Sequence, residues 1–172
     1  GPQNRNSELL GHKPFLVLSD FLTKIGIAVL RVDDRGVGES GGDFTTATTF
    51  DFANDVEAAV AYLKTRADLD TTKIGLIGHS EGGAIAPVVA SRNCSIDFIV
   101  MMAGPGLRGD KLMLLQKRKI EEQMNIDQAE VESAQKILGG AYEIVLNEEI
   151  KAANLNNELV AYFKSLPESG IS

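Results

Sequence analysis

The stretch of sequence that decides the fold reads Lys-Ile-Gly-Leu-Ile-Gly-His-Ser-Glu-Gly-Gly, residues 73–83. Its first half is a short apolar run, which is typical of a strand buried in a parallel sheet. Its second half contains the pattern G-x-S-x-G, and small residues follow it. A serine in such a strand-to-helix turn is held out of the sheet with its Oγ exposed, and flanking glycines avoid clashes in the sharp turn. The stretch therefore predicts a strand, a tight turn at Ser80 and a helix.

The residues on either side of this stretch continue the alternation of helices and strands. Apolar residues at helical spacing predict helices, and short β-branched runs bounded by turn residues predict strands. In chain order, we expect a helix over Lys13–Lys24, a strand over Ile27–Asp33, a helix over Phe52–Arg66, a strand over Lys73–Gly78, a helix over Glu81–Ser91 and a strand over Asp97–Ala103. This alternation indicates an α/β fold with a partial, mainly parallel sheet.

After Gly104-Pro105-Gly106 the pattern changes to helices alone. We expect four charged, amphipathic helices, over Lys111–Met124, Gln128–Leu138, Tyr142–Ala153 and Asn157–Ser165, with Gly139-Gly140 ending the second. The sequence therefore divides into an α/β core over residues 1–106 and a helical segment over residues 107–172. Met101, Met102, Met113 and Leu115 are candidates for an apolar pocket wall, with core packing as the alternative.

Composition limits the functions open to this chain. Its 172 residues carry a formal net charge of −7, with acids and bases interleaved, which argues against a nucleic-acid partner. No apolar run approaches the roughly 20 residues that a membrane-spanning helix needs. Two distant histidines and the single Cys94 do not make a metal site, and we expect no metal or cofactor.

Four motifs resemble those of α/β-hydrolase fold serine hydrolases, in the esterase and acyl-peptidase-like branch. The turn Gly78-His79-Ser80-Glu81-Gly82-Gly83 is similar to the nucleophile elbow of that branch, and Gly1–Arg5 is similar to its oxyanion turn. His12–Phe15 opens the first helix, and Asp33–Ser40 follows the first expected strand. The resemblance covers residues 1 to about 106, and it implies that the later helices form a cap or lid.

The resemblance assigns roles to individual residues. It implies that Ser80 is the nucleophile, that the backbone N–H of Glu81 is one oxyanion donor, and that a backbone N–H near Gln3, in the Gly1–Gln3 turn, is the other. The implied reaction is hydrolysis of a small-molecule carboxylic ester through an acyl-enzyme. Hydrolysis of short or acylated peptides is the alternative, because elbow sequences do not separate esters from amides. A third hypothesis is a non-catalytic assembly or binding module in which Ser80 is vestigial.

Neither histidine fits the general base that a serine nucleophile needs. His79 precedes the nucleophile, where a side chain normally packs locally, and His12 lies at the start of a helix. In the family the order is serine, acid, histidine, and no histidine follows Ser80. We therefore expect the chain to be an inactive excerpt of a longer enzyme, with the acid and the base in a missing C-terminal part.

The family sheet also carries a strand that leads into the oxyanion turn, between the Ile27–Asp33 strand and the Lys73–Gly78 strand. It would end just before Gly1. Without it, we expect the exposed strand edges to be covered by other segments, to pair with a second copy or to rearrange. A homo-oligomer would form through these edges or through the cap helices.

The loop Gly36-Val37-Gly38-Glu39-Ser40-Gly41 also matches the G-x-G-x-x-G pattern of dinucleotide-binding proteins. That pattern requires a helix to begin at once, so that its N-terminus receives the pyrophosphate. Here Gly42–Thr46 prolongs the loop, so we favour a turn beside the active site. We expect Asp34 and Arg35 to brace that turn through polar bonds.

Overall fold

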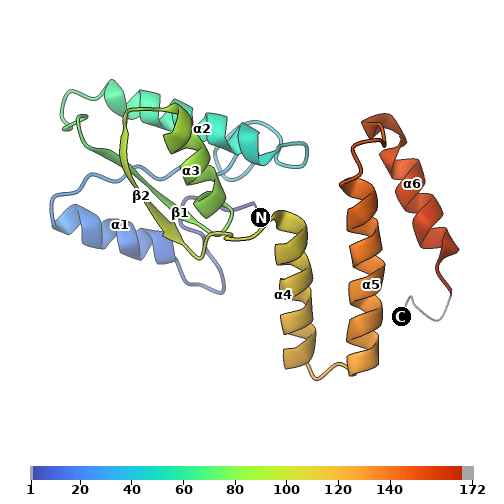
Figure 1. Ribbon diagram of the computed structural model, residues 1–172. Helices are drawn as coiled ribbons and strands as arrows, with labels where there is room; N and C mark the ends of the chain where they lie inside the picture. The colour runs from blue at the N-terminus through green and yellow to red at the C-terminus, as the bar shows by residue number, and fades with distance from the viewer. Residues whose placement is uncertain (1, 168–172) are drawn as a thin grey trace. The chain divides into compact units, whose positions relative to one another are not determined.

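The computed structural model describes residues 2–167 (Figure 1). The chain separates into two compact units, Gly1–Pro105 and Gly106–Ser172. The first unit contains strands and helices, and the second contains helices. In the part of the chain that the structure describes, no helix is both long and apolar enough to cross a membrane.

The first unit is built on a parallel pair of strands. β1 (Ile74–His79) and β2 (Ile96–Met102) pair in register from Gly75–Phe98 to His79–Met102, and α3 (Gly82–Arg92) connects them. The Phe98 ring lies against Gly75, at a place that any Cβ would fill. The expected β–α–β unit around Ser80 is therefore present, and an α/β fold with a small parallel sheet is confirmed.

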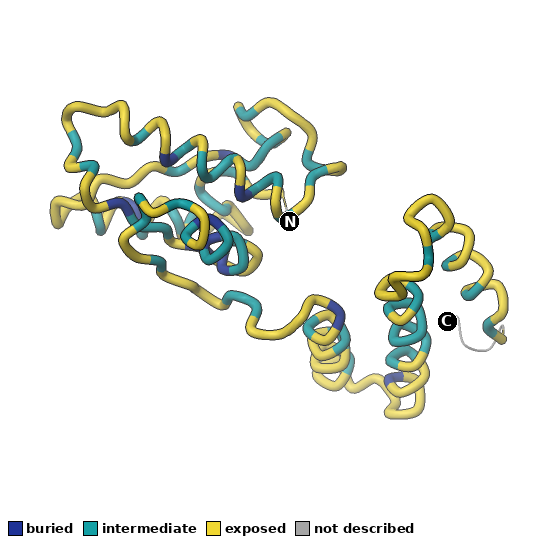
Figure 2. Tube along the Cα trace, turned by 45° about the horizontal axis from the view of Figure 1, so that its top comes forward, coloured by how far each residue is buried: buried dark blue, intermediate teal, exposed yellow. Residues whose placement is uncertain are grey.

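Helices lie on both sides of these strands. α3 packs on β1 and β2, and α2 (Thr49–Lys64) packs on α3. The buried apolar side chains of these two helices are those of Ala53, Val60, Ala86 and Val89. α1 (Pro14–Lys24) lies on the other side of the strands in Figure 1. Figure 2 shows that the buried positions of this unit are few and that most of the trace is exposed or intermediate.

α2 begins three residues earlier than the apolar pattern predicts. Thr48 caps its N-terminus: the Asp51 N–H donates to Thr48 Oγ1 at 3.3 Å, and the Thr48 N–H donates to Asp51 Oδ2 at 2.8 Å. This reciprocal pair satisfies two backbone donors that the first turn of a helix leaves free. The polar cap, rather than the apolar face, decides where α2 starts.

The predicted strand over residues 27–33 is wrong, because this segment forms neither a helix nor a strand. Among residues 2–167, β1 pairs only with β2, and no backbone-to-backbone hydrogen bond joins Ala28–Asp33 to another segment. Val29 and Val32 are 36% and 50% exposed. The local sequence favours a strand, but a strand forms only where a neighbour pairs with it.

The second unit consists, within its described residues, of α4 (Gly109–Gln123), α5 (Gln128–Val145) and α6 (Ala152–Ser165). The prediction of four helices is therefore wrong. Gly139-Gly140 does not end a helix, since α5 continues through both glycines, and the predicted helix over Tyr142–Ala153 is interrupted between α5 and α6. Tyr162 of α6 lies against Gly140, so the glycine allows two helices to approach closely.

Candidate active site

Ser80 lies at the turn where β1 ends and α3 is about to begin. Its backbone has a φ of +53°, a left-handed conformation that residues other than glycine rarely adopt. Two hydrogen bonds hold the turn: the Ser80 N–H donates to the Met102 carbonyl of β2, and the Gly83 N–H donates to the Ser80 carbonyl, each at 2.9 Å. Ser80 is exposed, and its Oγ makes no hydrogen bond within residues 2–167.

Two of the three flanking glycines are required by close backbone contacts. A Cβ on Gly78 would overlap the Gly82 carbonyl, and a Cβ on Gly83 would lie 2.5 Å from the Gly104 Cα. Gly82 has open space where its Cβ would lie. The turn therefore needs glycine at positions 78 and 83, whereas the steric reason does not extend to Gly82.

The backbone N–H of Glu81 is available to a ligand. Glu81 precedes the first residue of α3, and no acceptor within the described residues receives its N–H. The first N–H groups of a helix have no partner within the helix and point along its axis, where they favour negative charge. A developing oxyanion beside Ser80 would find such a donor.

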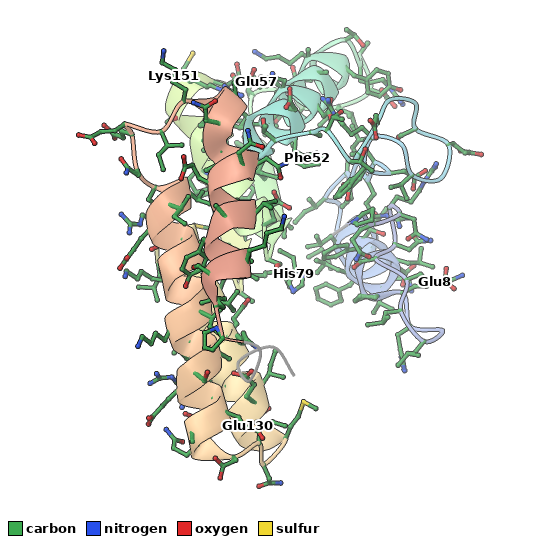
Figure 3. The ribbon with its side chains drawn as sticks, turned by 90° about the vertical axis from the view of Figure 1, so that its right-hand side faces the viewer. Glu8, Phe52, Glu57, His79, Glu130 and Lys151 are labelled. Carbon is green, nitrogen blue, oxygen red and sulfur yellow. The ribbon has the colours of Figure 1, made fainter. Side chains whose placement is uncertain are left out.

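His79 packs on a neighbouring ring, and His12 lies in a turn. The His79 side chain points toward α1, where its ring meets the Phe15 ring edge-on, with 5.9 Å between centroids and 72° between planes (Figure 3). The His12 backbone pairs with Leu9 in the turn before α1. No hydrogen bond joins either imidazole to Ser80 among the described residues.

Gln3 is placed against Asp34. The Gln3 N–H donates to Asp34 Oδ2 at 2.9 Å, and the Asp34 N–H donates to the Gln3 carbonyl at 3.1 Å. Burial raises the pKa of Asp34, and the nearby charges of Glu81 and Asp55 add to that rise, while the bond from Gln3 lowers it. The N–H expected to face an oxyanion is thus paired with a carboxylate in this structure. Gly1, the first residue of the expected oxyanion turn, lies outside the described residues.

Arg35 braces the loop against α2. Its guanidinium donates from Nε and Nη2 to the two carboxylate oxygens of Asp55, both at 2.7 Å, and from Nη2 to the Asp51 carbonyl at 3.0 Å. It also lies over the Phe52 ring, 5.8 Å from the centroid. The two residues therefore bind different segments: Asp34 binds the turn at Gln3, and Arg35 binds α2.

Asp33 fills the centre of the glycine-rich loop. Its side chain is 4% exposed and accepts from the Arg5 backbone N–H at 2.7 Å, from Arg5 Nη2 at 2.6 Å and from the Glu39 N–H at 3.1 Å. These bonds, above all those from the Arg5 side chain, hold the pKa of Asp33 well below its usual range. A Cβ on Gly38 would lie 2.6 Å from Asp33 Oδ2.

This geometry argues against the dinucleotide interpretation of G-x-G-x-x-G. The loop that would surround a pyrophosphate surrounds a carboxylate of the chain itself, and the next helix after the loop, α2, begins only at Thr49. Within residues 2–167, no group of three or more potential metal ligands is close enough to hold an ion.

Sequence reasoning missed the polar partners of Asp33 and Glu81. Arg5, which binds Asp33, comes from a turn 28 residues away. Thr49, whose Oγ1 donates to Glu81 Oε1 at 3.0 Å, comes from the first turn of α2. The acidic pair Asp33-Asp34 at the end of an apolar run was the signal that cationic or N–H partners lie nearby, but it does not say which ones.

Comparison with known proteins agrees with the motifs. Residues 14–137 match the family described as serine aminopeptidase, S33. The chain is also 30% identical over 135 residues to the esterase EstD of Thermotoga maritima, an alignment that covers 73% of this chain and 32% of that protein. The chain thus spans about a third of the length of this curated relative. The matched residues include the whole strand, turn and helix around Ser80. The chain therefore belongs to this S33 serine aminopeptidase family of α/β-hydrolases.

Proposed function

We propose that the protein to which this chain belongs hydrolyses carboxylic esters through an acyl-enzyme formed on Ser80. The observation that carries the proposal is the left-handed Ser80 at the end of β1, followed directly by Glu81, whose N–H has no acceptor within residues 2–167. The family match and the name of the Thermotoga relative, an esterase, support the same class of reaction.

The chemistry follows from the turn. Ser80 Oγ attacks the ester carbonyl carbon, and the carbonyl oxygen becomes an oxyanion that accepts from the Glu81 N–H. Collapse of this intermediate expels the alcohol and leaves an acyl group on Ser80, and water then releases the acid. Each donor aimed at such an oxyanion typically contributes about 10²–10³ in kcat, because it is already oriented when the charge develops.

Two parts of this mechanism depend on groups beyond the elbow. The Gln3 N–H serves as second donor only when Asp34 releases it, since Asp34 accepts that bond in this structure. The base that takes the Ser80 proton, and the acid that orients it, come in this proposal from outside the 172 residues, because His79 packs on Phe15 and His12 belongs to a turn.

Hydrolysis of p-nitrophenyl esters tests the proposal. The full-length protein should release p-nitrophenol, and Ser80→Ala should reduce the rate to background. The 172-residue chain alone should give no turnover above background. Turnover by that chain, lost on His12→Ala, would show that the base lies within it and would refute this part of the proposal.

Peptide hydrolysis is the second candidate, favoured by the family's description as a serine aminopeptidase. The same elbow can serve both reactions, so the two candidates differ in the leaving group that the enzyme accepts, an alcohol or an amine. Comparison of kcat/KM for matched aminoacyl p-nitrophenyl ester and p-nitroanilide substrates separates them. Efficient, Ser80-dependent cleavage of the anilide would favour the peptidase.

A further inference from the structure

Thr49 connects α2 to the elbow. Its Oγ1 donates to Glu81 Oε1 at 3.0 Å, so the first residue of one helix holds the side chain that precedes the next helix. The position of Thr49 is itself fixed, since Thr48 and Asp51 cap the same turn of α2. The bond therefore joins two ordered helix starts.

The packing of α2 against α3 makes this connection rigid. Ala53 of α2 and Val89 of α3 are fully buried, and the two helices lie in contact. At the far end of α3, Arg92 donates to Asn54 Oδ1 at 3.0 Å and pairs with Glu57 at 2.7 Å. Polar side-chain bonds thus join both ends of α3 to α2, and Thr49 makes the hydrogen bond at the end near Ser80.

Glu81 carries two groups with opposite effects on a negative charge at Ser80. Its backbone N–H favours an oxyanion, whereas its carboxylate repels one, and the repulsion grows as the distance shrinks. A free Glu81 side chain can rotate about several bonds and bring its charge toward the site. The Thr49 hydroxyl gives the carboxylate a fixed partner on α2.

We propose that Thr49 is a positioning residue for the reaction at Ser80: it holds the Glu81 carboxylate against α2, so that the Glu81 N–H acts on the oxyanion without interference from the charge of the same residue. The inference rests on the proposed hydrolase function. It assigns Thr49 an electrostatic role, which differs from a role in stability alone.

The test is a double-mutant cycle in the full-length protein, with p-nitrophenyl ester hydrolysis as readout. Thr49→Val removes the hydroxyl but keeps the shape of the side chain. We expect kcat to fall about fivefold to tenfold, with KM changed less than about twofold, because the bond is exposed and its loss should cost about as much as one ordinary hydrogen bond. Thr49→Ser keeps the hydroxyl and should retain the wild-type kcat. Thr46→Val, which removes a similar Thr-to-Asp43 bond in the preceding loop, should leave kcat unchanged.

The decisive comparison repeats Thr49→Val in a Glu81→Gln background. With no charge to hold, loss of the hydroxyl should change kcat less than about twofold. An equal fall of kcat in both backgrounds, or no fall in Thr49→Val, would overturn the inference. If Thr49→Val fails to fold, Thr49→Ala takes its place in the cycle.

The outcome for the wild type separates this inference from the proposed function. Turnover that Ser80→Ala abolishes upholds the hydrolase, and the cycle then decides the role of Thr49 alone. Turnover that does not depend on Ser80 would overturn both.

Discussion

Ser80 has an unfavourable backbone conformation that is held by hydrogen bonds on both sides of the turn. A left-handed conformation costs a residue with a Cβ roughly 1–2 kcal/mol. Hydrogen bonds to Met102 and from Gly83 fix the turn on both sides and offset this cost. The result is a hydroxyl presented to solvent at a rigid junction, which is what a nucleophile requires.

The glycines beside Ser80 make a matched pair of substitutions. Gly78→Ala should destabilise the fold by about 3 kcal/mol or more, because the added Cβ meets the Gly82 backbone, which cannot move aside without opening the turn. Gly82→Ala should be neutral or stabilising by up to about 1 kcal/mol, because the Cβ has open space at the first position of α3. Urea denaturation of both variants checks this, and equal effects would contradict the steric account of the turn.

Asp33 predicts a pH dependence of stability. Its folded pKa is depressed by Arg5, below an unfolded value of about 3.9, so its contribution is complete at neutral pH and is lost as pH falls through the interval between the two values. Below about pH 5, the unfolding free energy of the wild type should therefore fall more steeply with decreasing pH than that of Asp33→Asn. The difference in slope corresponds to at most one additional proton bound by the unfolded state. Urea midpoints between pH 7 and pH 2 measure this. Parallel curves for the two proteins would show that Asp33 does not titrate in this way.

At the scale of elements, apolar spacing predicted most helices but not their ends. Capping by Thr48 and Asp51 moved the start of α2, and Gly139-Gly140, which reads as a helix stop, lies inside α5. A glycine pair ends a helix only where nothing else compensates for its flexibility. Here the contact of Tyr162 with Gly140 does so, and that contact joins residues too far apart for local patterns to show.

The two glycines of α5 should respond differently to alanine. Gly140→Ala should destabilise the helical unit by about 1–3 kcal/mol, since the new Cβ would lie 2.7 Å from Tyr162 Cζ, and the ring is tied by its hydroxyl to the Ile137 carbonyl at 2.8 Å. Gly139→Ala meets open space and should stabilise the helix by roughly 0.5–1 kcal/mol. Thermal denaturation followed by circular dichroism distinguishes the two, and stabilisation by both variants would contradict this packing.

Residues 28–33, which make no backbone-to-backbone hydrogen bond within the described part of the chain, predict self-association of the 172-residue chain. Exposed β-branched residues and backbone groups of this kind favour pairing with another edge. A Val29→Lys, Val32→Lys double variant should weaken the association about tenfold or more, whereas Val160→Lys in α6, equally exposed but helical, should not. Analytical ultracentrifugation measures this. A chain that stays monomeric at high concentration would contradict the prediction.

At the scale of the whole molecule, the sequence predicted the strand, the turn and the helix around Ser80, because these elements are contiguous in the chain. The rest of the candidate site comes from separate segments: the turn at Gln3 and Arg5, the loop at Asp33–Arg35 and the start of α2 at Thr49. Which carboxylate meets which donor depends on how these segments pack. Local patterns therefore predicted the turn at Ser80 and Glu81, but not the partners of Asp33 or Glu81.

The central claim, that Ser80 is an activated nucleophile, is tested most directly by covalent labelling of the full-length protein with a fluorophosphonate probe. Digestion with trypsin and mass spectrometry locate the label. The account predicts one adduct on the peptide of residues 74–92, which contains Ser80, and none in Ser80→Ala. A folded full-length protein that takes up no label, or takes it up equally in Ser80→Ala, would contradict the account.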